Sequence, residues 1–297
     1  MTGDWRLATD MNSPRDLRRR IKSVSGTAQI TKAMQMVAGS KMRKAQEAAL
    51  AARPFAHLLY RIQRDATVRA RNFAHPLLEV REVRRRGVIL IAADKGLCGA
   101  LNTNVFRLAA QFDPATTLFI TAGRKAAQFV ARTRRQLAAE FAYGDSPTYP
   151  EARAIAAFAR DLFLKGEVDR VQIVATRFVN TLTQEPVSIE YLPVGAITGL
   201  RIPGIEAEDA LAADKDALFE PNVEAVLSYL LGHYLNIYVY VVLLNAKASE
   251  QSARMVSMKN ATDSAESLID TLKLEYNKLR QGNITKELLE IAGGQAG

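Results

Sequence analysis

The turn Asp94-Lys95-Gly96-Leu97-Cys98-Gly99 is the part of the sequence best suited to hold a ligand or a reactive group. It closely follows Val88–Ala92, a continuous apolar stretch typical of a strand buried on both faces. However, neither GxGxxG nor GxxxxGK followed by Ser or Thr occurs here or elsewhere. Gly39-Ser40-Lys41 lies within a heptad pattern and follows no strand, so it is not a phosphate loop. We therefore predict that this chain alone binds no nucleotide.

Cys98 is the one cysteine of the sequence, which excludes an internal disulfide framework and a metal site built from several thiols. No histidine lies in the predicted central domain to act as a base, so we predict a small buried thiol rather than a nucleophile. His57, His75 and His233 are far apart and lack the spacing of metal ligands. The sequence therefore predicts no catalytic residue, no metal and no other cofactor.

Positive charge is concentrated near the N-terminus. The 297 residues have a formal net charge of +9, and residues 13–86 contain about 18 Lys and Arg against about 5 Asp and Glu. This segment favours an anionic partner, which could be a nucleic acid, a lipid surface or an acidic protein. Its densest run has no interleaved aromatic residue and precedes no nucleic-acid recognition fold, and a merely solvated helix end is the alternative. The run consists of Arg15, Arg18, Arg19, Arg20 and Lys22.

The first of two long heptad segments begins with helix-start signals. Ser13 can be an N-cap, Pro14 fits the first helical position, and Asp16 sits where a capping-box acid would sit. We predict a helix from Pro14 to Arg64, with apolar or small residues at the alternating steps of three and four that are typical of a left-handed coiled coil. This seam consists of Leu17, Ile21, Val24, Ala28, Thr31, Ala38, Met42, Ala45, Ala49, Ala52, Ala56 and Leu59.

The second heptad segment is predicted to be helical from Pro221 to Ala292, with Gly293 and Gly294 ending it. Small residues of the first seam let the bulkier second seam approach closely, so we predict an antiparallel coiled coil within one chain. Pairing of each helix with a second copy is the alternative. Uncharged Ala225–Ala246 is long enough to cross a bilayer, yet its His, Asn and Tyr residues favour a buried helix. The second seam consists of Leu227, Leu230, Tyr234, Ile237, Val241, Leu244, Ala248, Gln251, Met255, Met258, Thr262, Ala265, Ile269, Leu272, Tyr276 and Leu279.

The middle of the chain is predicted to be an α/β domain with a mostly parallel sheet, because strand-like and helix-like stretches alternate. The strand-like stretches are Val88–Ala92, Leu118–Ala122, Val171–Ala175 and Val187–Leu192. The helix-like stretches lie near Asn104–Gln111, Arg124–Arg134 and Glu151–Lys165. The predicted divisions are 13–86 for the first coiled-coil helix and a basic connector, 87–200 for the central domain, 201–220 for a loop, and 221–294 for the second coiled-coil helix.

Several long motifs near the chain ends carry a family resemblance. At the N-terminal end they are LRRRIKSV (17–24), QITKAMQMVA (29–38) and SKMRKAQ (40–46). At the C-terminal end they are ASEQSARMVSMKNATD (248–263), EYNKLRQ (275–281) and NITKEL (283–288). Together with the turn at 94–99, this pattern spans residues 13–294 and resembles the gamma subunits of F-type ATP synthases.

The resemblance implies a non-catalytic rotor shaft of a proton-translocating ATP synthase. A ring of alternating alpha and beta subunits would surround the coiled coil, and the foot would rest, with the epsilon subunit, on the membrane-embedded c-ring. Proton flow would turn the c-ring and the shaft, and thereby cycle the catalytic beta subunits for ATP synthesis or hydrolysis. Residues 1–12 look like neither a signal nor a transit peptide, so the expected location is the cytoplasmic face of a bacterial inner membrane, with the mitochondrial matrix side as the alternative.

The resemblance also assigns contact residues for the alpha and beta ring. Lys32 and Met34 would lie near the acidic lever of a beta subunit, and Arg254, with Gln251 nearby, would make the catch contact with beta. The residues expected high on the last helix, against the inner surface of the ring, are Arg280, Gln281, Thr285 and Glu287. The residues expected to plug an apolar collar in the ring are Ile284, Leu288, Leu289 and Ile291.

Two other classes of function are open at this point. A basic coiled-coil protein that binds nucleic acid would show a steep dependence of DNA binding on salt. A small α/β enzyme with helical arms would show a pocket with perturbed titratable groups at the ends of the strands. The rotor hypothesis predicts neither property.

Overall fold

A computed structural model of the chain describes residues 13–69, 74–194, 220 and 222–294, with side chains for all of these except 52, 53, 55–69 and 292–294. The side chains of the predicted seam residues Ala52, Ala56 and Leu59, the side chain of His57 and most of the predicted loop at 201–220 lie outside this part. The chain divides into two units. Residues 1–37 and 255–297 form the helix-pair unit, and residues 38–254 form the α/β unit.

Two long helices confirm the two predicted helical segments. They are α1 (Pro14–Arg69) and α5 (Val223–Gly294). The predicted cap begins α1, because the Ser13 hydroxyl accepts a hydrogen bond from the backbone N–H of Asp16 at 3.2 Å. The second helix includes the two C-terminal glycines that the sequence predicts as its end, so glycine alone does not stop it there.

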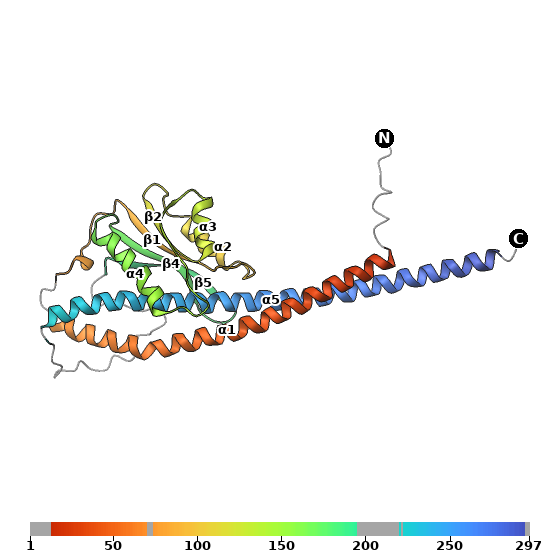
Figure 1. The fold of residues 1–297 in the computed structure, drawn as a ribbon, viewed down its shortest axis with the longest axis horizontal. Helices are drawn as coiled ribbons and strands as arrows, with labels where there is room; N and C mark the ends of the chain where they lie inside the picture. The colour runs from red at the N-terminus through yellow and green to blue at the C-terminus, as the bar shows by residue number, and fades with distance from the viewer. Residues whose placement is uncertain (1–12, 70–73, 195–219, 221, 295–297) are drawn as a thin grey trace. The chain divides into compact units, whose positions relative to one another are not determined.

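Within the helix-pair unit, the two helical segments run antiparallel (Figure 1). Thr31 Oγ1 lies 2.7 Å from Thr262 Oγ1, and Arg18 Nη2 donates to the Tyr276 hydroxyl at 2.6 Å. Residue numbers therefore rise along one helix as they fall along the other, which confirms pairing within one chain. Among residues 13–37 and 255–291, every buried residue belongs to the predicted seams: Leu17, Ala28, Thr31, Met258, Thr262, Ala265 and Leu272.

The α/β unit contains a five-stranded sheet in the order β3-β2-β1-β4-β5. Its strands are β1 (Arg86–Ile91), β2 (Thr117–Ala122), β3 (Gln136–Phe141), β4 (Arg170–Phe178) and β5 (Gln184–Leu192). All neighbours are parallel except β4 and β5, so the predicted mostly parallel sheet is confirmed. Strand β3 was not predicted, because its residues, QLAAEF, include no β-branched side chain.

Helices cover both faces of the sheet. On one face, α2 (Leu101–Ala109) and α3 (Arg124–Arg132) pack against alternate strand residues such as Val88 and Leu90. On the other face, α4 (Tyr149–Leu164), the short 3-10 helix η2 (Pro76–Leu78) and α5 pack against Ile89 and Ile91. Although α5 is apolar and long enough to cross a membrane, its side chains between 231 and 246 fill this core. The structure therefore favours the buried-helix alternative.

Candidate functional site at the carboxyl ends of the strands

The carboxyl ends of parallel strands are where open α/β sheets bind ligands. In this sheet, turns pack closely against one another there. Asp94 Oδ1 accepts a hydrogen bond from the backbone N–H of Arg124 at 2.9 Å, which ties the turn after β1 to the start of α3. Gly123, directly after β2, has a φ of 94°, and a Cβ at that position would lie 2.0 Å from the carbonyl oxygen of Ala92. Only glycine fits at this point of the edge.

Five charged side chains of alternating sign meet beside these turns and are here named the charge ladder: Lys41, Asp145, Lys247, Glu250 and Arg254. Lys41 Nζ lies 2.5 Å from Asp145 Oδ2, and Lys247 Nζ lies 3.2 Å from Asp145 Oδ1. Lys247 Nζ is also 3.1 Å from Glu250 Oε2. Glu250 Oε1 is 2.8 Å from Arg254 Nη1. An unbroken series of ion pairs thus joins α1, the connection between β3 and α4, and α5.

Burial differs sharply along the charge ladder. The side chains of Lys247 and Glu250 are 1% and 4% exposed, whereas those of Lys41 and Asp145 are 41% and 55% exposed. Charges as deeply buried as the first two require partners. Lys247 Nζ also lies 5.2 Å from the centre of the Tyr143 ring, a cation–π distance. The hydrogen bond from Lys41 lowers the pKa of Asp145 to about 2, against the effect of burial and with help from Lys247, so Asp145 is ionised at neutral pH.

Arg254 ends the ladder on the turn after β1. Its Nη2 donates to the carbonyl oxygens of Lys95 and Gly96 at 3.4 and 3.3 Å. The turn that the sequence offered for a ligand is therefore occupied by an arginine of α5. Gln251, predicted beside Arg254 as a contact residue, is 2% exposed. Contact of this pair with a beta subunit stays a prediction, and the structure gives Arg254 partners within its own chain.

Cys98 is a buried thiol, as predicted, with 2% exposure. Its Sγ donates to the carbonyl oxygen of Lys95 at 3.9 Å and accepts from Asn102 Nδ2 at 3.4 Å. Burial raises the pKa of the thiol, with a smaller opposing effect from Arg254. A raised pKa disfavours the thiolate that a nucleophile requires. Among the residues that the structure describes, no group of three or more His, Cys, Asp or Glu side chains could hold a metal ion.

The remaining predicted contact residues belong to the helix-pair unit. Lys32 is exposed and Met34 is half-buried. In the basic run, the Arg18 guanidinium lies 5.5 Å from the centre of the Tyr276 ring, in addition to its hydrogen bond there. Beyond Tyr276, every predicted contact residue is exposed: Arg280, Gln281, Ile284, Thr285, Glu287, Leu288, Leu289 and Ile291. Exposed apolar residues gathered on one segment are typical of a protein-binding surface.

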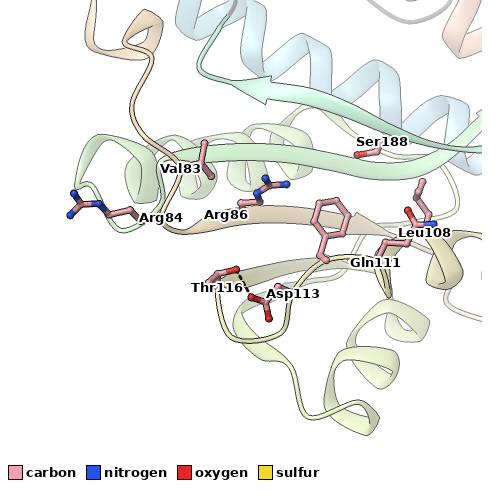
Figure 2. A pocket seen from close by; sticks show the side chains of 9 residues that line it. Val83, Arg84, Arg86, Leu108, Gln111, Asp113, Thr116 and Ser188 are labelled. Carbon is pink, nitrogen blue, oxygen red and sulfur yellow. Dashed lines mark hydrogen bonds between the residues drawn. The ribbon is translucent and has the colours of Figure 1, made fainter.

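A separate pocket of about 510 Å³ lies at the opposite, amino ends of the strands (Figure 2). Arg86, the first residue of β1, lines it, and so does Thr116, whose hydroxyl donates to Asp113 Oδ2 at 3.2 Å. The lining includes neither histidine nor cysteine, and its one carboxylate, that of Asp113, accepts the hydrogen bond from Thr116. This hollow lies at the amino ends, whereas an open α/β sheet binds ligands at the carboxyl ends. It therefore does not support the enzyme hypothesis.

Sequence reasoning identified only Arg254 of the charge ladder as a site residue and missed the other four members: Lys41, Asp145, Lys247 and Glu250. A signal was present in α5, where steps of three and four place Lys247, Glu250 and Arg254 on one helix face, directly after a long uncharged stretch. Asp145 carried no such signal, because it follows β3, the strand that was not predicted.

Similarity to known proteins extends over nearly the whole chain. Residues 13–297 match the family described as ATP synthase. The chain is 48% identical over 290 residues to the ATP synthase gamma chain of Opitutus terrae, which covers 96% of this chain and 98% of that protein. It is 43% identical over 289 residues to the ATP synthase gamma chain of Desulforamulus reducens, with 96% and 99% covered.

Solved structures show the same fold. One is a chain of the Euglena gracilis mitochondrial ATP synthase (OSCP/F1/c-ring, rotational state 3), with a TM-score of 0.66, 21% identity, and 95% of this chain and 93% of that chain covered. Another is from the central stalk and c-ring of the Tetrahymena thermophila mitochondrial ATP synthase, with a TM-score of 0.58, 24% identity, and 78% and 99% covered. These likenesses confirm the predicted fold class.

Proposed function

This chain belongs to the ATP synthase gamma chain family and is a component of the ATP synthase complex, and from that premise we propose that it is the non-catalytic central rotor shaft. In this role it couples rotation of the membrane c-ring to conformational cycling of the catalytic beta subunits. The antiparallel pairing of the two chain ends, with α5 exposed from Arg280 to Ile291, is the observation that carries the proposal.

Two unequal helices give each side of such a pair a different surface. The first segment exposes the cations of the basic run, whereas the other carries acidic residues such as Asp263, Glu266 and Asp270. Each beta subunit in a surrounding ring would meet a different surface and would be biased toward an open or closed form. Moving a subunit from almost all open to almost all closed requires about 5.5 kcal/mol of differential binding. One exposed ion pair supplies about 0–1 kcal/mol, so several contacts must act together.

Each group of predicted contact residues meets a different part of the complex. Lys32 and Met34 contact the acidic lever of a beta subunit, Gln251 and Arg254 contribute to the catch contact, and the exposed end of α5 meets the inner surface of the ring. The apolar residues Ile284, Leu288, Leu289 and Ile291, which are 47–67% exposed, lie in the collar. The epsilon subunit and the c-ring bind the foot, at the cytoplasmic face of a bacterial membrane, in keeping with the bacterial relatives.

The non-catalytic role is supported by the carboxyl edge of the sheet. Arg254 of α5 occupies the turn at which a ligand would bind, and the neighbouring thiol is buried with a raised pKa. The same family membership favours the rotor over a nucleic-acid-binding protein. The basic run then serves an acidic protein surface, which is one of the anionic partners that its charge allows.

The proposal is tested by co-purification and proton pumping. Tagged full-length chain, expressed with the other subunits, should co-purify with a nucleotide-binding hexamer. Deletion of residues 284–297 should reduce ATP-driven proton pumping in inverted membrane vesicles, whereas deletion of residues 295–297 alone should not. The rotor proposal is refuted if the full-length chain does not co-purify with the hexamer, or if vesicles containing the longer deletion pump as well as those with the shorter one.

A further inference from the structure

We propose that the charge ladder is the device that fixes the rotational setting of α5 against the sheet of the α/β unit, so that torque passes between them without slip. Lys247 and Glu250 are its positioning residues. The inference rests on the proposed rotor function, because only a rotating shaft needs such a coupling. It assigns a role to buried charges that no contact with another subunit requires.

The ladder connects four segments that are distant in the sequence. Lys41 belongs to α1, Asp145 to the connection between β3 and α4, and Glu250 to α5. Through Arg254, the ladder also reaches the carbonyl oxygens of the turn after β1. A rotation of α5 about its own axis would break several of these bonds at once, since they approach the helix from different segments.

The other contacts between α5 and the sheet resist rotation of α5 about its axis less than the ion pairs of the charge ladder do. Between 231 and 246 they are mostly apolar, with one hydrogen bond from the sheet, in which the Tyr191 hydroxyl donates to the carbonyl oxygen of Leu235 at 3.2 Å. Apolar burial is proportional to area and has no preferred direction. Charge-assisted hydrogen bonds are short and depend on geometry. Buried ionic groups often contribute little net stability, and a role in specifying one arrangement is the best-attested reason for retaining them.

The position of the ladder along α5 suits this role. Lys247, Glu250 and Arg254 occupy the last two turns of α5 that belong to the α/β unit, and the helix continues from Met255 into the helix-pair unit. Any torque carried along α5 passes through these turns. One further bond acts at the same level, where the Ser252 hydroxyl donates to the carbonyl oxygen of Thr181 at 2.7 Å, in the hairpin after β4.

The experiment uses the assembled complex with the double variant Lys247→Met, Glu250→Gln, which removes one buried charge of each sign and nearly conserves volume. The matched control, Arg177→Met, Glu185→Gln, removes one charge of each sign from an ion pair that is 54% and 47% exposed in the same unit. A bead is attached through Arg132→Cys on the exposed side of α3, because Cys98 is buried. Angular fluctuations of the bead during catalytic pauses report the stiffness of the coupling.

We expect the angular variance to rise at least about two-fold in the ladder variant, because the buried ion pairs made by Lys247 and Glu250 are removed, whereas the apolar contacts and the hydrogen bonds of Arg254 and Ser252 remain. The control should match the unsubstituted complex, and ATP hydrolysis should be unchanged in both. Lys41→Met, at the exposed end of the ladder, should give a smaller increase and serves if the double variant does not assemble. An unchanged variance in whichever variant assembles would overturn the inference. A bead that does not rotate at all on the unsubstituted complex would instead refute the proposed function.

Discussion

Glu250 is the residue whose substitution tests the energetics of the charge ladder most directly. It lies between two buried cations, with Lys247 Nζ and Arg254 Nη1 at 3.1 and 2.8 Å from its carboxylate oxygens. Glu250→Gln removes the negative charge and leaves both cations buried without a carboxylate between them. Breaking a buried ion pair from one side costs about 3–5 kcal/mol. We expect the lower end, because Lys247 keeps Asp145 and Arg254 keeps two backbone carbonyl groups.

The assay is thermal unfolding of the purified full-length chain, followed by circular dichroism. A loss of about 3 kcal/mol should lower the midpoint temperature by about 6–12 °C, at about 2–4 °C per kcal/mol for a unit of this size. The matched control is Glu185→Gln, which removes a carboxylate from the exposed pair with Arg177. That pair should contribute about 0–1 kcal/mol, so its midpoint should fall by less than about 4 °C.

A second substitution tests whether Glu250→Gln destabilises the chain by leaving buried cations without a carboxylate or by disturbing the local packing. Adding Lys247→Met to Glu250→Gln removes one of the two stranded cations, so the double variant should unfold at a higher temperature than Glu250→Gln alone. The reasoning is refuted if Glu250→Gln lowers the midpoint no more than Glu185→Gln does. It is refuted equally if the second substitution lowers the midpoint further.

Two more predictions concern neighbouring residues. Gly123→Ala should destabilise the chain by about 2–4 kcal/mol in urea unfolding, because its φ of 94° suits only glycine and the new Cβ would meet the Ala92 carbonyl. Gly96→Ala, with open space around its Cβ, should change stability by less than about 0.5 kcal/mol, and equal losses would contradict the argument. The pKa of Asp145 is lowered from 3.8 to about 2, so its ionisation stabilises the folded chain above about pH 4, and this contribution is lost as the pH falls toward 2. Lys41→Met should raise that pKa, so the variant should lose less unfolding free energy than the unsubstituted chain between about pH 5 and pH 2.5, and an equal loss would show that Lys41 does not set the pKa.

The local pattern of apolar residues was sufficient to predict the helices and the paired faces of the helix-pair unit, and most strands of the sheet. Heptad spacing predicted that Ala28, Thr31, Thr262 and Leu272 face a partner helix, and all four are buried. Apolar runs likewise predicted β1, β2 and β4, and a stretch that contains Val, Ile and Tyr predicted β5. The exception, β3, lies at an edge of the sheet and is only partly buried, and unlike the other edge strand, β5, it has no β-branched residue that would indicate a strand.

The family resemblance, too, was evident in the order of residues along the chain, because its motifs are contiguous.

The charge ladder could not be recognised from the sequence in this way. Lys247 and Glu250 resemble the solvated charges that most helices carry, and their spacing with Arg254 indicates a shared helix face but not that this face is buried. Their environment is decided by Asp145, about a hundred residues away, and by Tyr143, both delivered by the turn after β3. Sequence by itself therefore determined which segments are helices and strands and which faces are apolar, since these follow from short-range periodicity. Only the tertiary structure decided which charges are paired and buried, because that depends on segments that meet through the folding of the whole sheet.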